Sequence, residues 1–110
     1  MLIYHITERA AWKQAQTEGH YSPPSLTSEG FIHASTRDQV SDTANRYYRG
    51  LHGLALLVID LDNVRPTVRF DTVFHDGDEM KFPHIYGPLN LDAVVDVLPF
   101  EPDETGAFRF

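Results

Sequence analysis

Residues Leu54–Leu61 have the sequence LALLVIDL, in which apolar side chains occupy both odd and even positions. Successive residues of a strand point to opposite faces of a sheet, so a strand with this sequence is covered on both faces. Gly50 and Gly53 interrupt the chain before the run, and a turn over Asp62–Pro66 follows it. We therefore predict that Leu54–Leu61 is the central strand of a sheet.

The chain before this strand alternates short strands with two helices. The predicted elements are a strand over Leu2–Ile6, a helix from Glu8 to Gly19, a loop over His20–Glu29, a strand over Gly30–Ala34 and a helix opened by Thr36. Thr7 is a suitable N-cap for the first helix, and Gly19 a suitable end. Thr36 and Gln39 have the spacing of a capping box at the start of the second helix. A buried stripe of that helix is then predicted at Val40, Ala44, Tyr47 and Tyr48.

The chain after the central strand consists of further strands and turns. Strands are predicted over Val68–Phe70, Met80–Ile85, Ala93–Phe100 and Phe108–Phe110, with an acidic loop, HDGDE, over His75–Glu79. Two early helices followed by several strands are typical of α+β proteins. We expect residues 1–110 to form a single small α+β domain with a mostly antiparallel sheet and two N-terminal helices.

Composition excludes several classes of function. The 110 residues carry nine lysines and arginines against sixteen aspartates and glutamates, a net charge of −7. An acidic chain repels a polyanion, so duplex nucleic acid is not an expected partner. With no cysteine, the chain has no disulfide, thiolate metal ligand or cysteine nucleophile. No signal peptide and no apolar run of the ~20 residues that span a membrane is present, so we expect a soluble, cytoplasmic protein.

The negative charge is unevenly distributed along the chain. Residues 1–59 carry five acidic and five basic side chains, whereas residues 60–110 carry eleven acidic and four basic ones. An anionic ligand is therefore expected to prefer groups from the first half.

Three of the six histidines lie in apolar surroundings: His5 in LIYHI, His33 in GFIHAS and His84 in KFPHIYGPL. Burying an imidazole is costly unless it is hydrogen-bonded or used. His5 and His33 each precede a predicted helix start, where free backbone N–H groups favour anions. These residues predict a histidine-lined cleft for a nucleotide-like or phosphorylated small molecule.

Three blocks of sequence resemble one uncharacterised bacterial family, domain of unknown function 952. They are His5 with Trp12, the GFIHAST block at Gly30–Thr36 with Gln39, and the FPHIYGPL block at Phe82–Leu89. The resemblance covers nearly the whole chain. It implies a fold like that of the ADP-ribosyltransferases, a small α+β domain with a split, antiparallel sheet around a cleft, and it brings no established activity.

The resemblance to that fold also implies site residues. His5 on the first strand matches the histidine that contacts the ribose and nicotinamide amide of NAD, and His33 matches the motif residue of the next core strand. An arrangement of two histidines is similar to the tRNA 2′-phosphotransferase branch. The region of the third motif, Leu89–Asp92, offers no glutamate, which argues against ordinary protein ADP-ribosylation but not against NAD as a substrate.

The expected enzyme site therefore has His5 and His33 as catalytic residues. The expected substrate-binding residues are His84 and Tyr86, which line the cleft, and Ser35, Thr36 and Arg37, which meet phosphate. ADP-ribosyl or phosphoryl transfer is the activity class that this set implies, with NAD as substrate and no metal ion.

Three alternatives remain open from the residues. A non-catalytic module of the same fold would keep the cleft without the chemistry. A two-histidine phosphoesterase would use the His-x-Thr/Ser pairs at His5–Thr7 and His33–Ser35. A zinc site would need His5, His33 and His84 to converge; the Asp76–Glu79 loop lacks the acidic spacing of a calcium loop.

Overall fold

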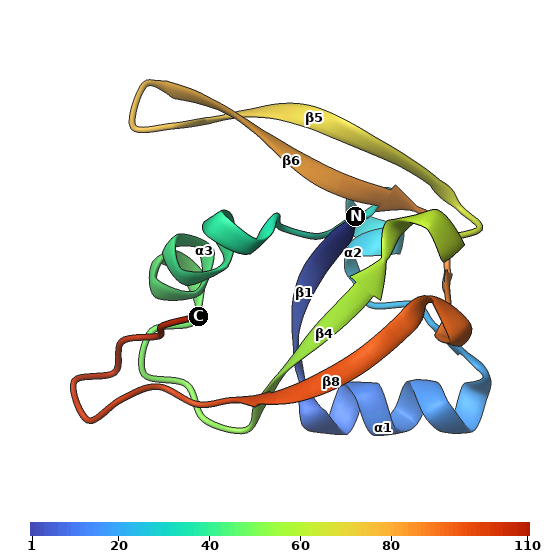
Figure 1. The fold of residues 1–110 in the computed structure, drawn as a ribbon, viewed down its shortest axis with the longest axis horizontal. Helices are drawn as coiled ribbons and strands as arrows, with labels where there is room; N and C mark the ends of the chain where they lie inside the picture. Colours follow the sequence, from blue (N-terminus) through green and yellow to red (C-terminus); the bar gives the residue numbers. More distant parts are fainter.

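The computed structural model describes residues 1–110 as an α+β domain of three small antiparallel sheets and three α-helices (Figure 1). The strands are β1 (Leu2–Glu8), β2 (His20–Tyr21), β3 (Ile32–His33), β4 (Leu54–Asp60), β5 (Thr67–His75), β6 (Asp78–Tyr86), β7 (Leu89–Asn90) and β8 (Val94–Phe100). The helices are α1 (Arg9–Glu18), α2 (Ser25–Ser28) and α3 (Val40–Tyr47). Single 3₁₀ turns lie at Arg37–Gln39, Leu61–Asn63 and Leu91–Ala93. None of the helices is both long and apolar enough to cross a membrane.

The central sheet has the strand order β1-β4-β8, and the prediction of a central strand is confirmed for β4. Residues Leu54–Ile59 are all buried. Their alternate side chains supply two separate cores: Leu57 and Ile59 join one, whereas Leu54, Leu56 and Val58 join the other. The apolar run therefore forms a strand with a hydrophobic layer on each face.

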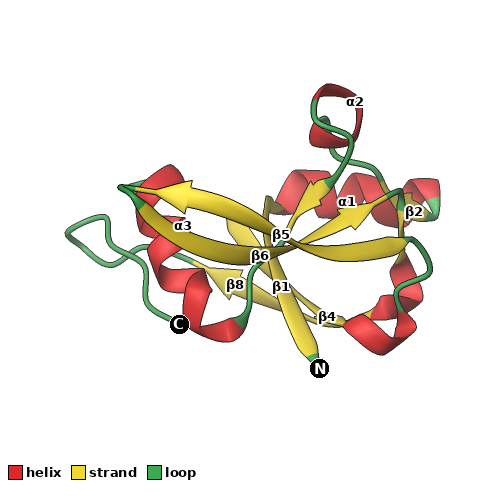
Figure 2. Ribbon diagram, turned by 90° about the horizontal axis from the view of Figure 1, so that it is seen from above, coloured by secondary structure: helices red, strands yellow, loops and turns green.

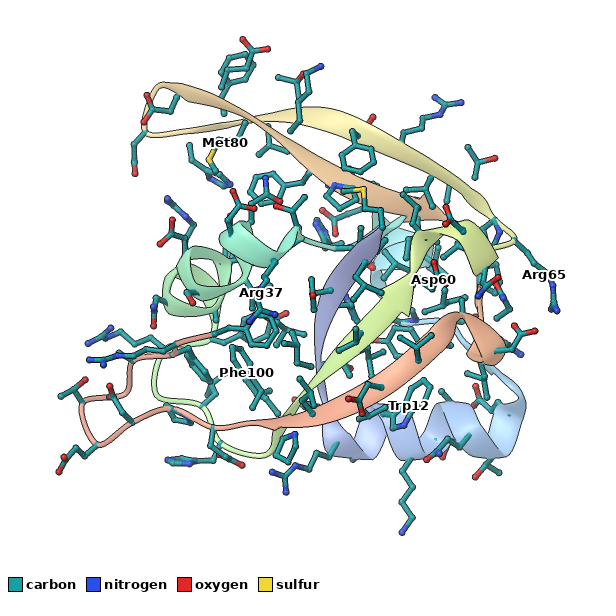
Figure 3. All side chains as sticks on the ribbon, in the orientation of Figure 1. Trp12, Arg37, Asp60, Arg65, Met80 and Phe100 are labelled. Atoms are coloured by element: carbon teal, nitrogen blue, oxygen red, sulfur yellow. The ribbon has the colours of Figure 1, made fainter.

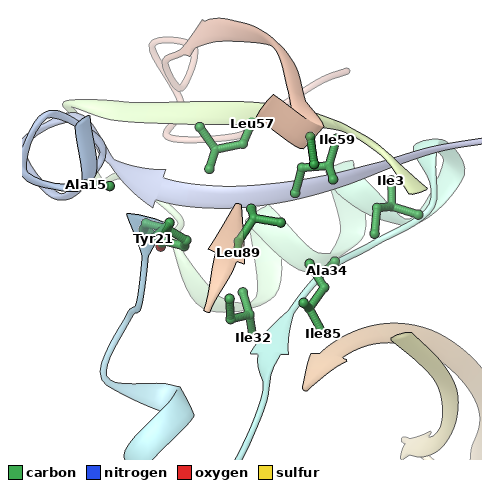
Figure 4. Packing of buried hydrophobic residues seen from close by; sticks show 10 residues of the cluster. Ile3, Ala15, Tyr21, Ile32, Ala34, Leu57, Ile59, Ile85 and Leu89 are labelled. Carbon is green, nitrogen blue, oxygen red and sulfur yellow. The ribbon is translucent and has the colours of Figure 1, made fainter. Parts of the chain in front are cut away.

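The first core packs between the central sheet and the two other sheets. In Figure 4, Leu57 and Ile59 of β4 and Ile3 of β1 face Ile32, Ile85 and Leu89, which come from β3, β6 and β7. The second core lies on the other face, where Val40 and Ala44 of α3 pack with Phe100 and Phe108. Burial of these two sets joins the three sheets into one domain.

The second three-stranded sheet, of order β3-β6-β5, contains a long hairpin. Strands β5 and β6 pair along their whole length, from Thr67 opposite Tyr86 to His75 opposite Asp78. The hairpin lies above the central sheet in Figure 1 and crosses over β1 when it is viewed from above (Figure 2). It therefore forms a second layer of strands that faces β1 and α3.

The predicted loop over His75–Glu79 is wrong, because both strands extend to a two-residue turn. Asp76 and Gly77 have φ values of 51° and 83°. Two consecutive left-handed residues of the sequence Asp-Gly are typical of the tight hairpin turn whose twist matches that of the strands. The Asp76-Gly77 pair is typical of a hairpin turn, but the acidic residues around it favoured the interpretation of the whole segment as a loop.

Several helix predictions need correction. The first helix begins at Arg9 and not at Glu8, and Thr7 lies in β1 without capping it. It ends at Gly19, which has a φ of 87°, as predicted. The capping box of Thr36 and Gln39 is confirmed, although it opens a 3₁₀ turn that continues into α3. Tyr47 is 61% exposed and does not belong to the buried stripe.

The loop and strand boundaries also differ from prediction. The predicted loop over His20–Glu29 contains β2 and α2, because β2 gains a partner in β7 that is distant in sequence. The strand predicted over Gly30–Ala34 is limited to Ile32–His33. The predicted two N-terminal helices become three with α2.

The C-terminal segment is not a strand, but side chains of α3 fix it in place. Asn45 donates a hydrogen bond to the Phe108 carbonyl at 3.0 Å and accepts one from the Phe108 N–H at 2.7 Å. Ser41 accepts a hydrogen bond from the Phe110 N–H at 2.9 Å. Phe108 is thereby held in the second core, where only 1% of its surface is exposed.

We predict that Asn45→Ala lowers the free energy of unfolding by about 1–3 kcal/mol, because it leaves the two backbone groups of Phe108 without their partner. Urea denaturation followed by circular dichroism measures this change. Gln16→Ala is the control, since Gln16 is exposed on α1 and its loss should be nearly neutral. Equal stability of the wild type and Asn45→Ala would contradict the anchoring role.

Candidate functional site

A cleft of about 1050 Å³ opens between β1, α1, the α2 segment, α3 and the β5–β6 hairpin. His5, His33 and His84 all line it, although they lie far apart in sequence and on three different strands. The pairing of β3 with β6 sets His33 directly opposite His84. The cleft has the size of sites that hold small molecules in proteins.

His5 is buried, and both of its ring nitrogens are hydrogen-bonded. Nδ1 donates to the main-chain carbonyl of His33, and Nε2 lies 2.7 Å from the Tyr21 hydroxyl. That hydroxyl also lies 2.9 Å from Thr7 Oγ1. Because a carbonyl only accepts, the proton of a neutral His5 is on Nδ1 and Nε2 accepts from Tyr21. His5, Tyr21 and Thr7 thus form a closed polar network in the cleft wall.

Burial keeps this network uncharged. It lowers the pKa of His5 to about 4, although the bond to the His33 carbonyl opposes the change. Burial also raises the pKa of Tyr21 to about 12. His5 is therefore neutral at neutral pH and is placed to fix the main chain at His33. The sequence offered Tyr21 only as one of several aromatic residues for stacking and gave no sign of its contact with His5, which depends on the antiparallel pairing of β2 with β7.

The His33 side chain is 55% exposed and pairs with a carboxylate. Its Nε2 lies 2.8 Å from Glu29 Oε2 and donates to it. Nδ1 has no partner within the protein. Glu29 follows directly after the short helix α2 and also lines the cleft. Glu29 was not predicted as a site residue, because it lies in the segment predicted to be a loop.

His84 is held by a second carboxylate. Its Nδ1 donates to Asp71 Oδ2 at 2.8 Å, and the hydroxyl of Tyr86 donates to the same oxygen. The Phe31 ring stacks on the His84 ring with centroids 4.0 Å apart and an interplanar angle of 12°. The Asp71 side chain is 33% exposed, whereas that of His84 is 7% exposed. Asp71 was not predicted, since β5 was expected to end at Phe70.

The hydrogen bonds around Asp71 favour its ionised form. The bond from Tyr86, and next the bond from His84, lower the pKa of Asp71. The same contact with Asp71 raises the pKa of Tyr86. Asp71 is therefore a carboxylate that orients His84 and Tyr86 together, so Tyr86 contributes to the site through Asp71.

The two imidazoles that carboxylates orient lie next to each other. The ring centroids of His33 and His84 are 5.5 Å apart, with an interplanar angle of 78°. Each ring uses one nitrogen for its carboxylate, and no hydrogen bond within the protein occupies the other. His33 Nδ1 and His84 Nε2 are therefore both available to contact the same ligand.

Of the three residues expected to meet phosphate, only Ser35 lines the cleft. Ser35 lines the cleft, but its hydroxyl lies 3.5 Å from Thr43 Oγ1. Thr36 donates to Asp38 at 2.6 Å, outside the cleft lining. Arg37 lies over the Phe110 ring at 4.3 Å, on the α3 side of the central sheet (Figure 3). Arg37, the arginine that was expected to bind phosphate, thus contacts the C-terminal residue Phe110.

The charged residues of the cleft lining are acidic. Glu8, Glu18 and Glu29 line the cleft, and no lysine or arginine does. The basic residues of the first half, which were expected to favour an anionic ligand, thus lie outside this lining. No three histidine, aspartate or glutamate side chains are grouped so that they could hold a metal ion.

Comparison with solved structures finds a protein of the same fold, CC0527 from Caulobacter crescentus. Its crystal structure has a TM-score of 0.87 and 29% sequence identity, with 99% of this chain and 94% of that chain covered. The crystal structure of a double mutant of that protein gives the same values. Its solution NMR structure has a TM-score of 0.81 and 30% identity, with 96% and 90% of the two chains covered. The architecture of this chain is therefore also that of a protein whose structure has been determined by crystallography and by NMR.

No curated protein matches the chain in sequence. The model of one family, described as Protein of unknown function (DUF952), matches residues 6–97. That range includes His33 and His84 with their carboxylate partners, whereas His5, the third histidine predicted from the sequence to line the cleft, lies just before it. The chain therefore belongs to the DUF952 family of proteins of unknown function.

Proposed function

We propose that the cleft binds a nucleoside-like small molecule, a heteroaromatic ring joined to a ribose, of which the nicotinamide riboside portion of NAD is one example. The observation that carries this proposal is the lining of the cleft, which combines aromatic rings and histidines with three glutamates and no lysine or arginine. Such a lining suits a ligand part that is neutral or positively charged. The positively charged nicotinamide ring of NAD meets this requirement.

Aromatic side chains supply surfaces on which a planar ring can stack. Phe31, Phe82, Tyr47 and Tyr48 all line the cleft. Phe31 already stacks on His84, so the addition of a ligand ring would extend an existing stack. Offset stacking of this kind contributes about 0.5–1.5 kcal/mol per ring pair beyond the area that is buried.

Carboxylates are suitable partners for the ribose hydroxyls, since an acidic side chain accepts hydrogen bonds from a ribose diol. Glu29 is a candidate, because it lies in the cleft beside His33. Phosphate groups of a larger ligand would extend outside the acidic lining. In this proposal the domain has an ADP-ribosyltransferase-like fold with His5 on its first strand, and His5 acts by positioning His33, not by touching the ligand.

Titration followed by NMR of the histidine ring nitrogens tests the proposal. Nicotinamide riboside, NAD and ADP-ribose are each added to millimolar concentration. We expect nicotinamide riboside to shift the signals of His33 and His84 and to bind more tightly than ADP-ribose, which has no cationic ring. Absence of any shift with all three ligands, or tighter binding of ADP-ribose, would overturn the proposal.

A matched pair of variants strengthens the test. Glu29→Gln should weaken the binding of nicotinamide riboside by about tenfold, which corresponds to about 1.4 kcal/mol. Glu104→Gln makes the same chemical change at an exposed residue outside the cleft, and its binding should equal that of the wild type. An equal effect of both variants would mean that only net charge matters.

The second candidate is a non-catalytic binding module. It is favoured by Asn90 and Asp92, which lie in the region where the resemblance implied a glutamate. Both side chains bind Arg65: Asn90 accepts a hydrogen bond from the Arg65 main-chain N–H at 2.9 Å, and Asp92 accepts one from the Arg65 guanidinium at 2.8 Å. The two-histidine phosphoesterase has less support, because both nitrogens of His5 are used within the protein. Turnover of a bound ligand separates an enzyme from a binding module.

A further inference from the structure

We propose that His84 and His33 are the general base and general acid of a hydrolase that cleaves the N-ribosyl bond of nucleosides with an uncharged ring. This inference rests on the proposed function and names its reaction and substrate class. It is carried by two imidazoles in one cleft wall, each oriented by its own carboxylate, with ring centroids 5.5 Å apart.

The surroundings of His84 suit a general base. Its Nδ1–H is directed at Asp71, so the lone pair of the neutral ring is on Nε2. Nε2 has no hydrogen-bond partner in the protein, and no side-chain nitrogen without a partner is fully buried. Because His84 lines the cleft, a ligand can reach this nitrogen. The Asp71 carboxylate stabilises the imidazolium that forms when Nε2 takes a proton. The Phe31 ring, 4.0 Å away and nearly parallel, also favours a cation.

The surroundings of His33 suit a general acid. Its Nε2–H is bound to Glu29, and its other nitrogen is free to carry a proton to a ligand. The side chain is 55% exposed, so water can restore that proton after each turnover. The contact between His5 and the His33 carbonyl fixes the main chain from which this imidazole projects. Both proton-transfer groups are thus placed by bonds within the protein.

The proposed step balances in atoms and charge. His84 removes a proton from a water molecule, whose oxygen forms a bond to C1′ of the ribose. The bond between C1′ and the ring nitrogen breaks, its electron pair passes to that nitrogen, and His33 donates the proton that the leaving ring requires. The products are the free base and ribose, and the two histidines exchange one proton with solvent to return to their starting states.

The charge of the cleft favours this reaction over phosphoryl transfer. Cleavage of an N-ribosyl bond passes through a ribose that carries positive charge, which Glu8, Glu18 and Glu29 stabilise. Phosphoryl transfer would develop negative charge in a lining that has no lysine or arginine. A pyridinium ring leaves as a neutral molecule without protonation, so only an uncharged ring makes use of both histidines.

Release of free base, separated by chromatography, measures the activity, with adenosine, inosine and uridine as probes. We expect His84→Gln and His33→Gln each to lower kcat for a cleaved nucleoside by about 100-fold or more, with little change in KM. Asp71→Asn should lower kcat and change its pH profile, because Asp71 acts through His84. His52→Gln is the control, since His52 is exposed and lies outside the cleft.

The outcomes separate this inference from the proposed function. Circular dichroism and ligand binding by NMR establish that each variant is folded. Binding of nicotinamide riboside without release of base from any nucleoside overturns the inference and leaves the proposed function intact, whereas absence of binding overturns both. Full activity of His84→Gln also overturns it. Cleavage of nicotinamide riboside that persists in His33→Gln, together with loss of adenosine cleavage, supports the assignment of the acid.

Discussion

Truncation of Leu56 or Leu57 to alanine is expected to lower the free energy of unfolding by about 2–5 kcal/mol for each substitution. The two side chains lie on opposite faces of β4, and both are fully buried. Leu57 belongs to the core shared with β3, β6 and β7, and Leu56 to the core shared with α3. Each truncation therefore opens a cavity in a different hydrophobic layer.

Urea denaturation measures both effects, with Val97→Ala as the control. Val97 pairs with Leu57 across the β4–β8 ladder, but the residue is 36% exposed. Its truncation should cost less than either leucine truncation. If one leucine variant were as stable as the control, β4 would be covered on one face only, and the two-layered core would be wrong.

Acidification from pH 7 to pH 4 is expected to remove about 3 kcal/mol of stability through His5 alone, because a pKa change of one unit corresponds to about 1.4 kcal/mol. Burial lowers the pKa of His5 from its ordinary value of 6.5 to about 4 in the folded protein. Between these values the unfolded chain binds the proton more tightly than the folded protein does. The stability that neutral His5 contributes is therefore fully present above pH 6.5 and is lost as the pH falls to about 4.

Urea denaturation of the wild type and of His5→Gln between pH 7 and pH 4 tests this prediction. Glutamine is neutral throughout and can donate to the His33 carbonyl while it accepts from Tyr21. The stability difference between the two proteins should change across this range, with the variant less sensitive to acid. Parallel pH curves for the two proteins would show that His5 does not titrate as its burial requires. Side-chain hydrogen bonds lower the pKa of three carboxylates, Asp71, Asp92 and Asp103, from its ordinary value.

Local sequence signals predicted those elements whose causes are local. The apolar run at Leu54–Leu61 indicated a strand buried on both faces. Gly19 indicated the end of the first helix, and the Thr36–Gln39 capping box indicated where the next helical segment begins. These features depend on the side chains of a few neighbouring residues. The short strands β2 and β7 had no such signal, since each is defined by hydrogen bonds to the other, about seventy residues away.

The residues of the candidate site also fall into two groups: those that the sequence indicated and those that only the structure shows. The three histidines stood out because an imidazole among apolar residues needs a partner, and the structure brings all three to one cleft. Their partners could not be found from sequence: Tyr21 reaches His5 across sixteen residues, and Asp71 reaches His84 through the register of the hairpin. Arg37 lies outside the cleft lining because it covers Phe110, whose position depends on the whole domain.

The sequence by itself determined an acidic α+β domain with a central strand in the apolar run Leu54–Leu61 and histidines that require partners. Only the tertiary structure decided which carboxylate orients each histidine and that the cleft lining is free of basic residues. The physical reason is that periodicity and capping act within a few residues, whereas strand register and the packing of the C-terminal segment on α3 join residues across the chain.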